Sequence, residues 1–280
     1  MPRGRMDRAI CIRRFSWYNG EKDGKELVFP MLLMRPFGEE YDKKRWWIGP
    51  VLFICYVLLP YPVMDGLWLA AEWSDRLYGF LAVDSNLDLL FDLYDVALCL
   101  AAIWLLRRPL AQAWAGLRAY PKGRLVVTLV LLPVIDEAMT WAEWLITDWL
   151  EGTMGVVSGN QSAIEELAAT GTHTWLFILV TAVAGPILEE LIFRYGIFRP
   201  LERRSRFVAY VVTAGLFALM HVWAYAVFDG DWRQLLDGLV YLVGGVVLTA
   251  VYDVTGNITF PILLHIWCNS VATYYMLLPA

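Results

Sequence analysis

Charged and polar side chains occur inside apolar segments of the C-terminal part of the chain, where an ionisable group is costly and is a functional candidate by default. The set comprises Glu189, Glu190 and Arg194 in GPILEELIFR, Phe217 and His221 in GLFALMH, and His265 and Asn269 in PILLHIWCN. Together these groups can supply a general base and an electrophilic site. The combination favours hydrolysis of an amide bond, which needs an activated water and a stabilised carbonyl oxygen.

Helical spacing relates the charged groups of the first segment to one another. Side chains four residues apart share one face of a helix, so we expect Glu190 and Arg194 to form an ion pair with the acid in the favourable N-terminal position. Glu189 lies about 100° further round the helix. Its carboxylate is therefore expected to face elsewhere.

The other two segments repeat the spacing of four. His265 and Asn269 share a face and can aim two polar groups at one point, as can Phe217 and His221. A half-buried Glu189 beside His221 can accept a proton from water. The pair on the last segment can equally form hydrogen bonds between helices, so a structural interpretation stays open.

Zinc is the main mechanistic alternative. Glu189, His221 and His265 are acceptable ligands that would leave a fourth position open. The HExxH motif is absent, however, and the ligands would come from three separate helices. A serine or cysteine nucleophile is not expected, because Cys268 and Ser270 point away from the polar face of their segment on an ideal helix.

These groups need elements that hold them inside a membrane. Hydrophobic residues make up 59% of the 280 residues and charged residues 18%, against about half and about a quarter in soluble domains. Apolar runs long enough to cross a bilayer occur at 46–70, 87–106, 125–147, 174–193, 207–228, 234–252 and 258–278. No period-2 strand pattern occurs. We therefore expect an all-α, polytopic membrane helix bundle of about seven transmembrane helices, or eight if one is missed.

Basic residues predict the orientation of the bundle. The segment before Trp46 contains eleven Lys and Arg, whereas 148–173 contains none. The segments 107–124 and 194–206 are also basic and are assigned to the side of the N-terminus. The positive-inside rule then predicts a cytoplasmic N-terminus and, with seven spans, an external C-terminus.

We accordingly divide the chain into three parts. Residues 1–45 form a cytoplasmic or interfacial arm, 46–173 form three transmembrane helices without an assigned role, and 174–280 form a catalytic core. No basic tract with interleaved aromatic residues occurs, so no nucleic-acid partner is expected. The four cysteines include no CxxC pair, which argues against a disulfide or zinc framework.

Further acids lie in the third predicted span, outside the three polar segments. Asp136, Glu137 and Glu143 occur in LLPVIDEAMTWAEW, and the first and last of them are spaced to share a helix face. They form either a polar stripe that faces a cavity or a contact with a substrate.

The three polar segments resemble the signatures of a known family. EELIFR matches EExxxR, FALMH matches FxxxH and HIWCN matches HxxxN, the motifs of the CAAX protease and bacteriocin-processing superfamily of glutamic-type intramembrane endopeptidases. The resemblance covers about 174–278. It implies a metal-independent peptidase without a cofactor, which acts on a membrane-associated peptide or protein within the lipid bilayer. A prokaryotic inner membrane is the expected location.

The resemblance also implies a role for each matched residue. Glu189 corresponds to the glutamate that activates a water, and His221 to the histidine that helps to hold this water. His265 and Asn269 correspond to the pair that stabilises the oxyanion. The supporting positions are Glu190, Arg194 and Phe217.

Two other functions would use the same buried groups, namely a small transporter or proton relay, and a scaffold without catalytic activity. Internal repeats would favour a transporter, and none is found; the intact motifs argue against a scaffold. Members of the superfamily cleave prenylated CAAX proteins, bacteriocin leaders or C-terminal sorting tags. The sequence does not choose between these substrates, because residues 1–173 resemble no named family.

Overall fold

The computed structural model describes residues 46–278, without the side chain of Arg124. All regular elements in this range are helices, as the sequence predicts. The predicted arm at 1–45 lies outside the described residues. In chain order, with π-helical segments written η, the elements are α2 (Ile48–Phe53), η2 (Ile54–Leu58), α3 (Pro60–Ala71), α4 (Asp75–Leu81), α5 (Asp84–Leu105), α6 (Arg107–Ala119), α7 (Lys122–Trp149), η3 (Leu150–Met154), α8 (Gly159–Thr170), α9 (Thr174–Leu179), η4 (Val180–Ala184), α10 (Gly185–Glu190), η5 (Leu191–Phe198), α11 (Arg199–Leu201), α12 (Arg206–Phe228), α13 (Gln234–Thr255) and α14 (Thr259–Met276).

The described residues form a polytopic helical membrane protein. The helices long and apolar enough to cross a membrane are Leu125–Met154, Thr174–Leu201, Arg206–Phe228 and Gln234–Thr255. Two bent pairs raise the number from 4 to 6 if each pair is one span: α2–η2 with α3, bent by 47°, and α5 with α6, bent by 74°. This range lies below the predicted seven. The last predicted span is present as α14, but His265 and Asn269 interrupt its apolar run.

Two predicted loops and the end of one predicted span need correction. The predicted basic loop after the second span contains α6, and the predicted external loop at 148–173 contains α8. The fourth predicted span does not end at 193 but continues as helix to Leu201. Arg194 therefore lies inside this helix with no exposed surface, and it does not belong with the cytoplasmic loop residues to which the count of basic residues assigned it.

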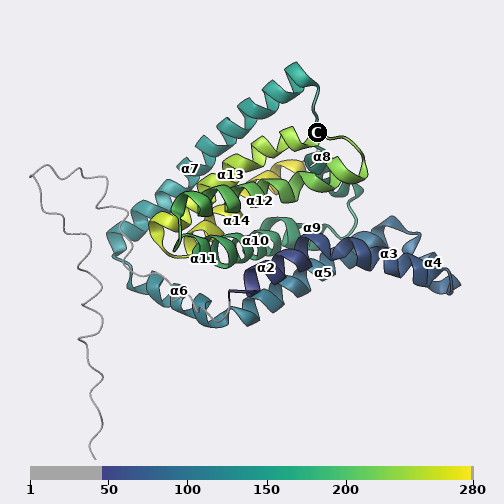
Figure 1. Ribbon diagram of the computed structural model, residues 1–280, viewed down its shortest axis with the longest axis horizontal. Helices are drawn as coiled ribbons and strands as arrows, with labels where there is room; N and C mark the ends of the chain where they lie inside the picture. Colours follow the sequence, from purple (N-terminus) through teal and green to yellow (C-terminus); the bar gives the residue numbers. More distant parts are fainter. Residues whose placement is uncertain (1–45, 279–280) are drawn as a thin grey trace, which may run out of the picture. The chain divides into compact units, whose positions relative to one another are not determined.

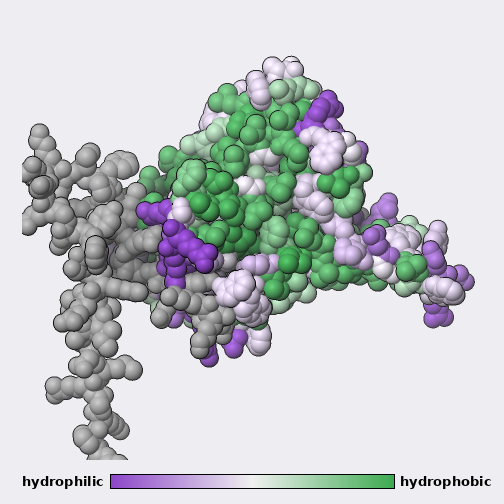
Figure 2. Space-filling model, in the orientation of Figure 1, coloured by the Kyte–Doolittle hydropathy of each residue, from purple (hydrophilic) through white to green (hydrophobic). Residues whose placement is uncertain are grey.

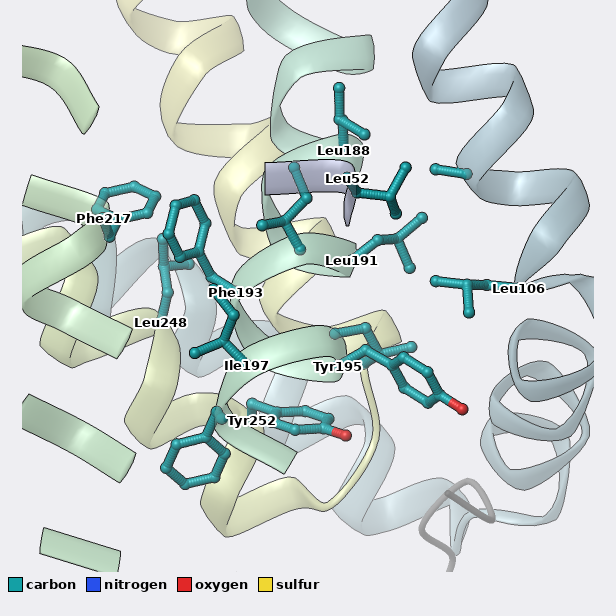
Figure 3. Packing of buried hydrophobic residues seen from close by; sticks show 14 of the residues in the cluster. Leu52, Leu106, Leu188, Leu191, Phe193, Tyr195, Ile197, Phe217, Leu248 and Tyr252 are labelled. Atoms are coloured by element: carbon teal, nitrogen blue, oxygen red, sulfur yellow. The ribbon is translucent and has the colours of Figure 1, made fainter. Parts of the chain in front are cut away.

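The helix Thr174–Leu201 is the most buried of the candidate spans, and it packs against α2, α5, α12 and α14 (Figure 1). Its side chains Leu188, Leu191 and Phe193 belong to a buried cluster with residues of the surrounding helices (Figure 3). Because lipid tails are as apolar as these side chains, close packing holds the helices together rather than transfer out of water. This helix carries the first polar motif and thereby places it at the centre of the bundle.

Small residues allow the closest helix contacts. A Cβ atom on Gly49 of α2 would lie 2.4 Å from the carbonyl oxygen of Gly196 in η5, so no side chain fits at that crossing. A Cβ atom on Gly245 of α13 would lie 3.1 Å from the Cα atom of Ala214 in α12. Backbones that approach this closely are typical of helix interfaces in membranes.

Apolar side chains cover the outward faces of the helices. Figure 2 shows hydrophobic residues over α7, α12 and α13, and exposed side chains there include Val130, Val211 and Leu239. Such surfaces suit contact with lipid. The polar motif residues lie inside the bundle instead.

Candidate active site

Glu190 lies at the centre of a buried cluster of charges. Its Oε1 atom accepts hydrogen bonds from Nη1 of Arg194 at 2.9 Å and from Nδ1 of His265 at 2.9 Å. The side chains of Glu190 and Arg194 have no exposed surface, and their predicted ion pair is confirmed. The contact with His265 crosses from α10 to α14, and helical spacing does not predict it.

Arg194 is held from two further directions. Its Nη2 atom donates to the carbonyl oxygen of Gly245 at 3.3 Å, and its guanidinium carbon lies 4.7 Å from the ring centroid of Phe217. The same ring lies 4.9 Å from the ring of His221 and 6.0 Å from that of His265. Phe217 therefore contacts both imidazoles as well as the guanidinium, which explains the need for an aromatic residue there.

Of the two adjacent glutamates, Glu189 is the one that lines a cavity. Its Oε1 atom accepts a hydrogen bond from the hydroxyl of Tyr56 at 3.1 Å. Its Oε2 atom lies 3.8 Å from Nε2 of His265 and has no hydrogen-bond partner among the described residues. Glu190 does not line the cavity, so the two adjacent glutamates face different surroundings, as their angular separation predicts.

The hydrogen bonds of the histidines indicate which ring nitrogen carries a proton. Nδ1 of His221 lies 2.8 Å from the carbonyl oxygen of Phe217. A carbonyl oxygen only accepts, so Nδ1 carries the hydrogen, and Nε2 of a neutral His221 is left as an acceptor. By the same argument, Nδ1 of His265 donates to the carboxylate of Glu190.

Tyr241 holds the ring of His221 from the other side. The two rings stack at 4.2 Å with an interplanar angle of 10°. The Tyr241 hydroxyl accepts a hydrogen bond from Nδ2 of Asn160 at 3.0 Å and lies 3.3 Å from Oγ of Ser158. Contacts of Ser158 and Asn160, at the start of α8, with the Tyr241 hydroxyl therefore extend to the motif histidine through the Tyr241 ring of α13.

Asn269 is fixed by one of its two amide hydrogens. Its Nδ2 atom donates to the carbonyl oxygen of Thr181 at 2.9 Å. An amide nitrogen carries two hydrogens, so the second can donate to another acceptor. This geometry orients the side chain without using up its donor capacity.

One cavity of about 990 Å³ brings the predicted catalytic residues together. It is lined by Glu189, His221, His265 and Asn269, which come from α10, α12 and α14. Among the supporting residues, Phe217 also lines it, whereas Glu190 and Arg194 do not. These four residues place a carboxylate, two imidazoles and an amide around one cavity.

The N-terminal helices supply part of the wall, which the sequence left without a role. Tyr56 of η2 and Asp95 of α5 line the cavity, as do Asp136 and Glu143 of α7. Glu137 does not; its carboxylate accepts a hydrogen bond from Trp141 on the exposed side of α7. Two of the three acids in the third predicted span thus form the predicted cavity-facing stripe.

The prediction for Cys268 is wrong. This side chain lines the same cavity as the motif residues. The reason is geometric: Cys268 follows His265 by three residues, and residues three apart on a helix are neighbours on one face. Tyr56 and Tyr241, by contrast, have no motif or spacing by which the sequence could have revealed them.

The residues as placed do not form a metal site. Among residues 46–278, no group of three His, Cys, Asp or Glu side chains is arranged to hold a metal ion. This applies to Glu189, His221 and His265, the predicted alternative set of zinc ligands.

The fold and the site define a class: a polytopic helical membrane protein with a glutamate, two histidines and an asparagine around an intramembrane cavity. Residues 171–271 match the family model described as type II CAAX prenyl endopeptidase Rce1-like, and this segment contains all three motifs. Through this segment the chain is similar to membrane CAAX protease homologues.

Two curated relatives come from bacteria. "Putative membrane peptidase YdiL" of Bacillus subtilis (strain 168) is 32% identical over 105 residues, which cover 37% of this chain and 38% of the relative. "Membrane-embedded CAAX protease MroQ" of Staphylococcus aureus (strain USA300) is 28% identical over 117 residues, which cover 41% of this chain and 44% of the relative. The matches thus span about two fifths of the length of these relatives. No solved structure matches the chain significantly.

Proposed function

We propose that this protein is a glutamic-type intramembrane endopeptidase that hydrolyses a peptide bond of a membrane-associated peptide or protein. The observation that supports this most directly is that two hydrogen-bond acceptors without donors among the described residues line one cavity. Glu189 contributes a carboxylate oxygen without a hydrogen-bond partner, and His221 contributes a ring nitrogen without a proton. The match of residues 171–271 to the type II CAAX prenyl endopeptidase Rce1-like family model supports the same proposal.

Glu189 and His221 would activate the nucleophile. A water that donates one hydrogen to Nε2 of His221 and the other to Oε2 of Glu189 is oriented by both. Glu189 removes a proton from this water as the oxygen attacks the carbonyl carbon of the substrate, which is general base catalysis. The hydrogen bond from Tyr56 holds the other carboxylate oxygen in place.

His265 and Asn269 would stabilise the oxyanion of the tetrahedral intermediate. To donate to an oxyanion, His265 must carry a hydrogen on both ring nitrogens; the carboxylates of Glu189 and Glu190 lie 3.8 Å from Nε2 and 2.9 Å from Nδ1. Nδ1–H of that imidazolium donates to Glu190, and Nε2–H is available for the oxyanion. The second amide hydrogen of Asn269 supplies another donor. Donors placed before the reaction need no reorganisation as the charge develops.

When the tetrahedral intermediate collapses, the C–N bond breaks and the protonated Glu189 passes its proton to the leaving amine. The carboxylate of Glu189 is thereby regenerated.

We further propose 174–280 as the catalytic core and 46–173 as a wall of the substrate cavity. The support for the second assignment is the presence of Tyr56, Asp95 and Glu143 on the cavity. The bacterial relatives favour a bacterial cell membrane as the location. Prenylated CAAX proteins, bacteriocin leaders and C-terminal sorting tags are the candidate substrates.

The experiment is a cleavage assay with purified protein in lipid nanodiscs and quenched fluorescent peptides from each candidate class. Glu189→Gln keeps the shape of the side chain but removes the base, so activity should fall by about 10²–10⁴-fold. Asn269→Ala should cost about 10²–10³-fold through the lost donor. Glu137→Gln is the matched control, since that glutamate lies outside the cavity. Equal rates for Glu189→Gln and wild type would refute the proposed base.

Zinc is tested on the same preparation. We expect the active protein to contain much less than one zinc per chain, and we expect chelators to leave its cleavage rate unchanged. Stoichiometric zinc, together with chelator inhibition that added metal reverses, would replace the glutamic mechanism with a metal-dependent one.

A further inference from the structure

The helix α6 has two faces of opposite character. Its buried residues are Pro109, Ala113 and Gly116, whose spacings of four and three place them on one side of the helix. All charged residues of α6 lie on the exposed side. The helix is therefore amphipathic, and an exposed face with arginine and tryptophan is typical of a helix at a membrane surface.

The inner face of α6 is fixed to the start of α14. Nδ2 of Asn257 donates to the backbone carbonyl oxygen of Ala113 at 2.8 Å, and Asn257 is buried. The ring of Tyr120, directly after α6, packs edge-on against Phe260 with the ring centroids 5.5 Å apart. A buried hydrogen bond of this kind is costly to break, so the other face of α6 points away from the bundle in a defined orientation.

Two arginines and a tryptophan form a stripe along the exposed face. At 100° per residue, Arg107, Trp114 and Arg118 lie within about 40° of one another around the helix axis. The guanidinium carbon of Arg118 lies 5.4 Å from the ring centroid of Trp114, and that of Arg107 lies 4.7 Å from the ring of Trp104. Both indoles are exposed. Stacking uses the flat face of a guanidinium and leaves N–H donors at its edge for an anionic partner.

The positive charge of this face has no counter-charge nearby in the chain. The sequence contains five Lys and Arg but no Asp or Glu between Asp95 and Asp136. Among the described residues, no acidic side chain forms an ion pair with Arg107, Arg108 or Arg118. An anionic partner from outside the described bundle would therefore meet uncompensated positive charge.

The position of α6 in the fold suits the surface of a membrane. Arg206 at the start of α12 pairs with Asp253 near the end of α13, and Asn257, just after α13, bonds to α6. The basic residues of α6 and those before α12 therefore lie at one end of the bundle, the end predicted to be cytoplasmic. Relative to α5, which contains the predicted second span, α6 is bent by 74° (Figure 1). The helix thus runs closer to the plane of the membrane than to its normal.

We propose that the exposed face of α6 binds anionic phospholipid headgroups at the cytoplasmic surface of the membrane, with Arg107 and Arg118 donating to phosphate oxygens. A guanidinium can donate two parallel hydrogen bonds to one phosphate. The indoles of Trp104 and Trp114 suit the depth of the headgroups, and the lipids supply the negative charge that this face lacks. No residue of α6 lines the cavity of the candidate active site, so the surface is separate from it and the proposal does not depend on the proposed cleavage.

A fluorophore on α6 reports which lipids lie next to this face. Ala115→Cys provides an exposed attachment site in the full-length protein with its four native cysteines replaced by alanine. Phosphatidylcholine nanodiscs contain the same minor fraction of phosphatidylglycerol or phosphatidylcholine with brominated acyl chains, which quench at short range. We expect quenching by the brominated phosphatidylglycerol to be at least about twofold stronger at low salt, with an excess that shrinks as ionic strength rises. Equal quenching by the two lipids at low salt would overturn the proposal.

Charge-matched double variants locate the effect. Arg107→Gln with Arg118→Gln should remove most of the excess quenching by phosphatidylglycerol. Arg108→Gln with Arg118→Gln is a second neutral pair, which keeps the backbone contact of Arg107 and should lower the excess as well. Arg76→Gln with Arg233→Gln removes the same charge from exposed positions on the predicted outer side and should leave the excess unchanged. An excess that survives in the folded α6 variants, or that falls equally in the outer pair, would overturn the proposal.

Other occupants of this face would give different results, each of which overturns the proposal. If the excess appears only when Glu39, Glu40 and Asp42 are changed to Gln, Gln and Asn, the acidic N-terminal segment of the chain occupies the face. If neither lipid quenches the fluorophore and a thiol at position 115 crosslinks to a second copy, the face is a dimer interface. If glycerol phosphate removes the excess at an ionic strength where sodium chloride does not, the ligand is a soluble phosphate compound rather than a lipid.

Discussion

The buried pair of Glu190 and Arg194 allows a quantitative test of the site. Both side chains have no exposed surface, so removing one partner leaves an uncompensated buried charge. Such a change typically costs about 3–5 kcal/mol. Glu190→Gln leaves Arg194 without its hydrogen-bonded carboxylate, although the Gly245 carbonyl and the rings of Phe217 and Phe193 remain. The rings offset part of the loss, so we expect a cost of about 3 kcal/mol, at the low end of this range.

The structure predicts an asymmetry between the two single variants. Arg194→Met leaves Glu190 with a second hydrogen-bond donor, because Nδ1 of His265 still lies 2.9 Å away. The expected cost is therefore smaller, about 2 kcal/mol. The double variant has neither charge, so its cost should fall short of the sum of the single costs by about 1.5 kcal/mol or more.

The assay is unfolding of the purified protein in mixed micelles of increasing SDS content, followed by far-ultraviolet circular dichroism. Free energies from the midpoints give a double-mutant cycle for Glu190 and Arg194. Activity provides a second measurement: the double variant should regain stability but not full turnover, because His265 no longer faces a charged Glu190. Additive costs, or a Glu190→Gln variant within about 1 kcal/mol of wild type, would refute the importance of this ion pair.

Three further predictions concern the surroundings of the site and its orientation. Tyr241→Phe keeps the ring stacked on His221 and should retain most activity. Tyr241→Leu removes the ring and should lower kcat more than it raises KM. An equal loss of activity in the two variants would argue against positioning of His221 through the ring. Cys268→Ala should keep activity, although Cys268 lines the cavity. Alkylation of Cys268 should inhibit the wild-type protein only because the added group occupies space in the cavity. An inactive but folded Cys268→Ala protein would point to a thiol nucleophile. In a protein without native cysteines, Glu165→Cys should react with an impermeant maleimide from outside and Arg203→Cys only from the cytoplasm, and the reverse pattern would invert the orientation.

Local helical geometry accounts for the parts of the site that the sequence predicted correctly. The contact between Glu190 and Arg194 is made within one helical turn, so spacing alone was enough to predict it. The different surroundings of Glu189 follow from the same geometry. The error at Cys268 has a similar local origin, because a spacing of three also places residues on a shared face.

Contacts between distant segments could not be predicted in this way. The hydrogen bond of Glu190 with His265 spans 75 positions, and that of Glu189 with Tyr56 spans 133. Hydrophobic periodicity shows that a helix has an apolar surface but not which neighbour covers it. The bend after η2 was missed for a related reason, because it lies within the continuous apolar run 46–70, which looks like a simple span.

The sequence by itself determined that the chain forms membrane helices and which polar residues are out of place in them. It could do so because lipid leaves an apolar segment few alternatives to a helix, and because the cost of a buried charge marks it as functional. Only the tertiary structure decided that Tyr56 and Glu143 share a cavity with the motif residues and that Tyr241 holds His221. Those contacts depend on how helices pack, and packing is set by the shapes of many side chains together rather than by the spacing of a few.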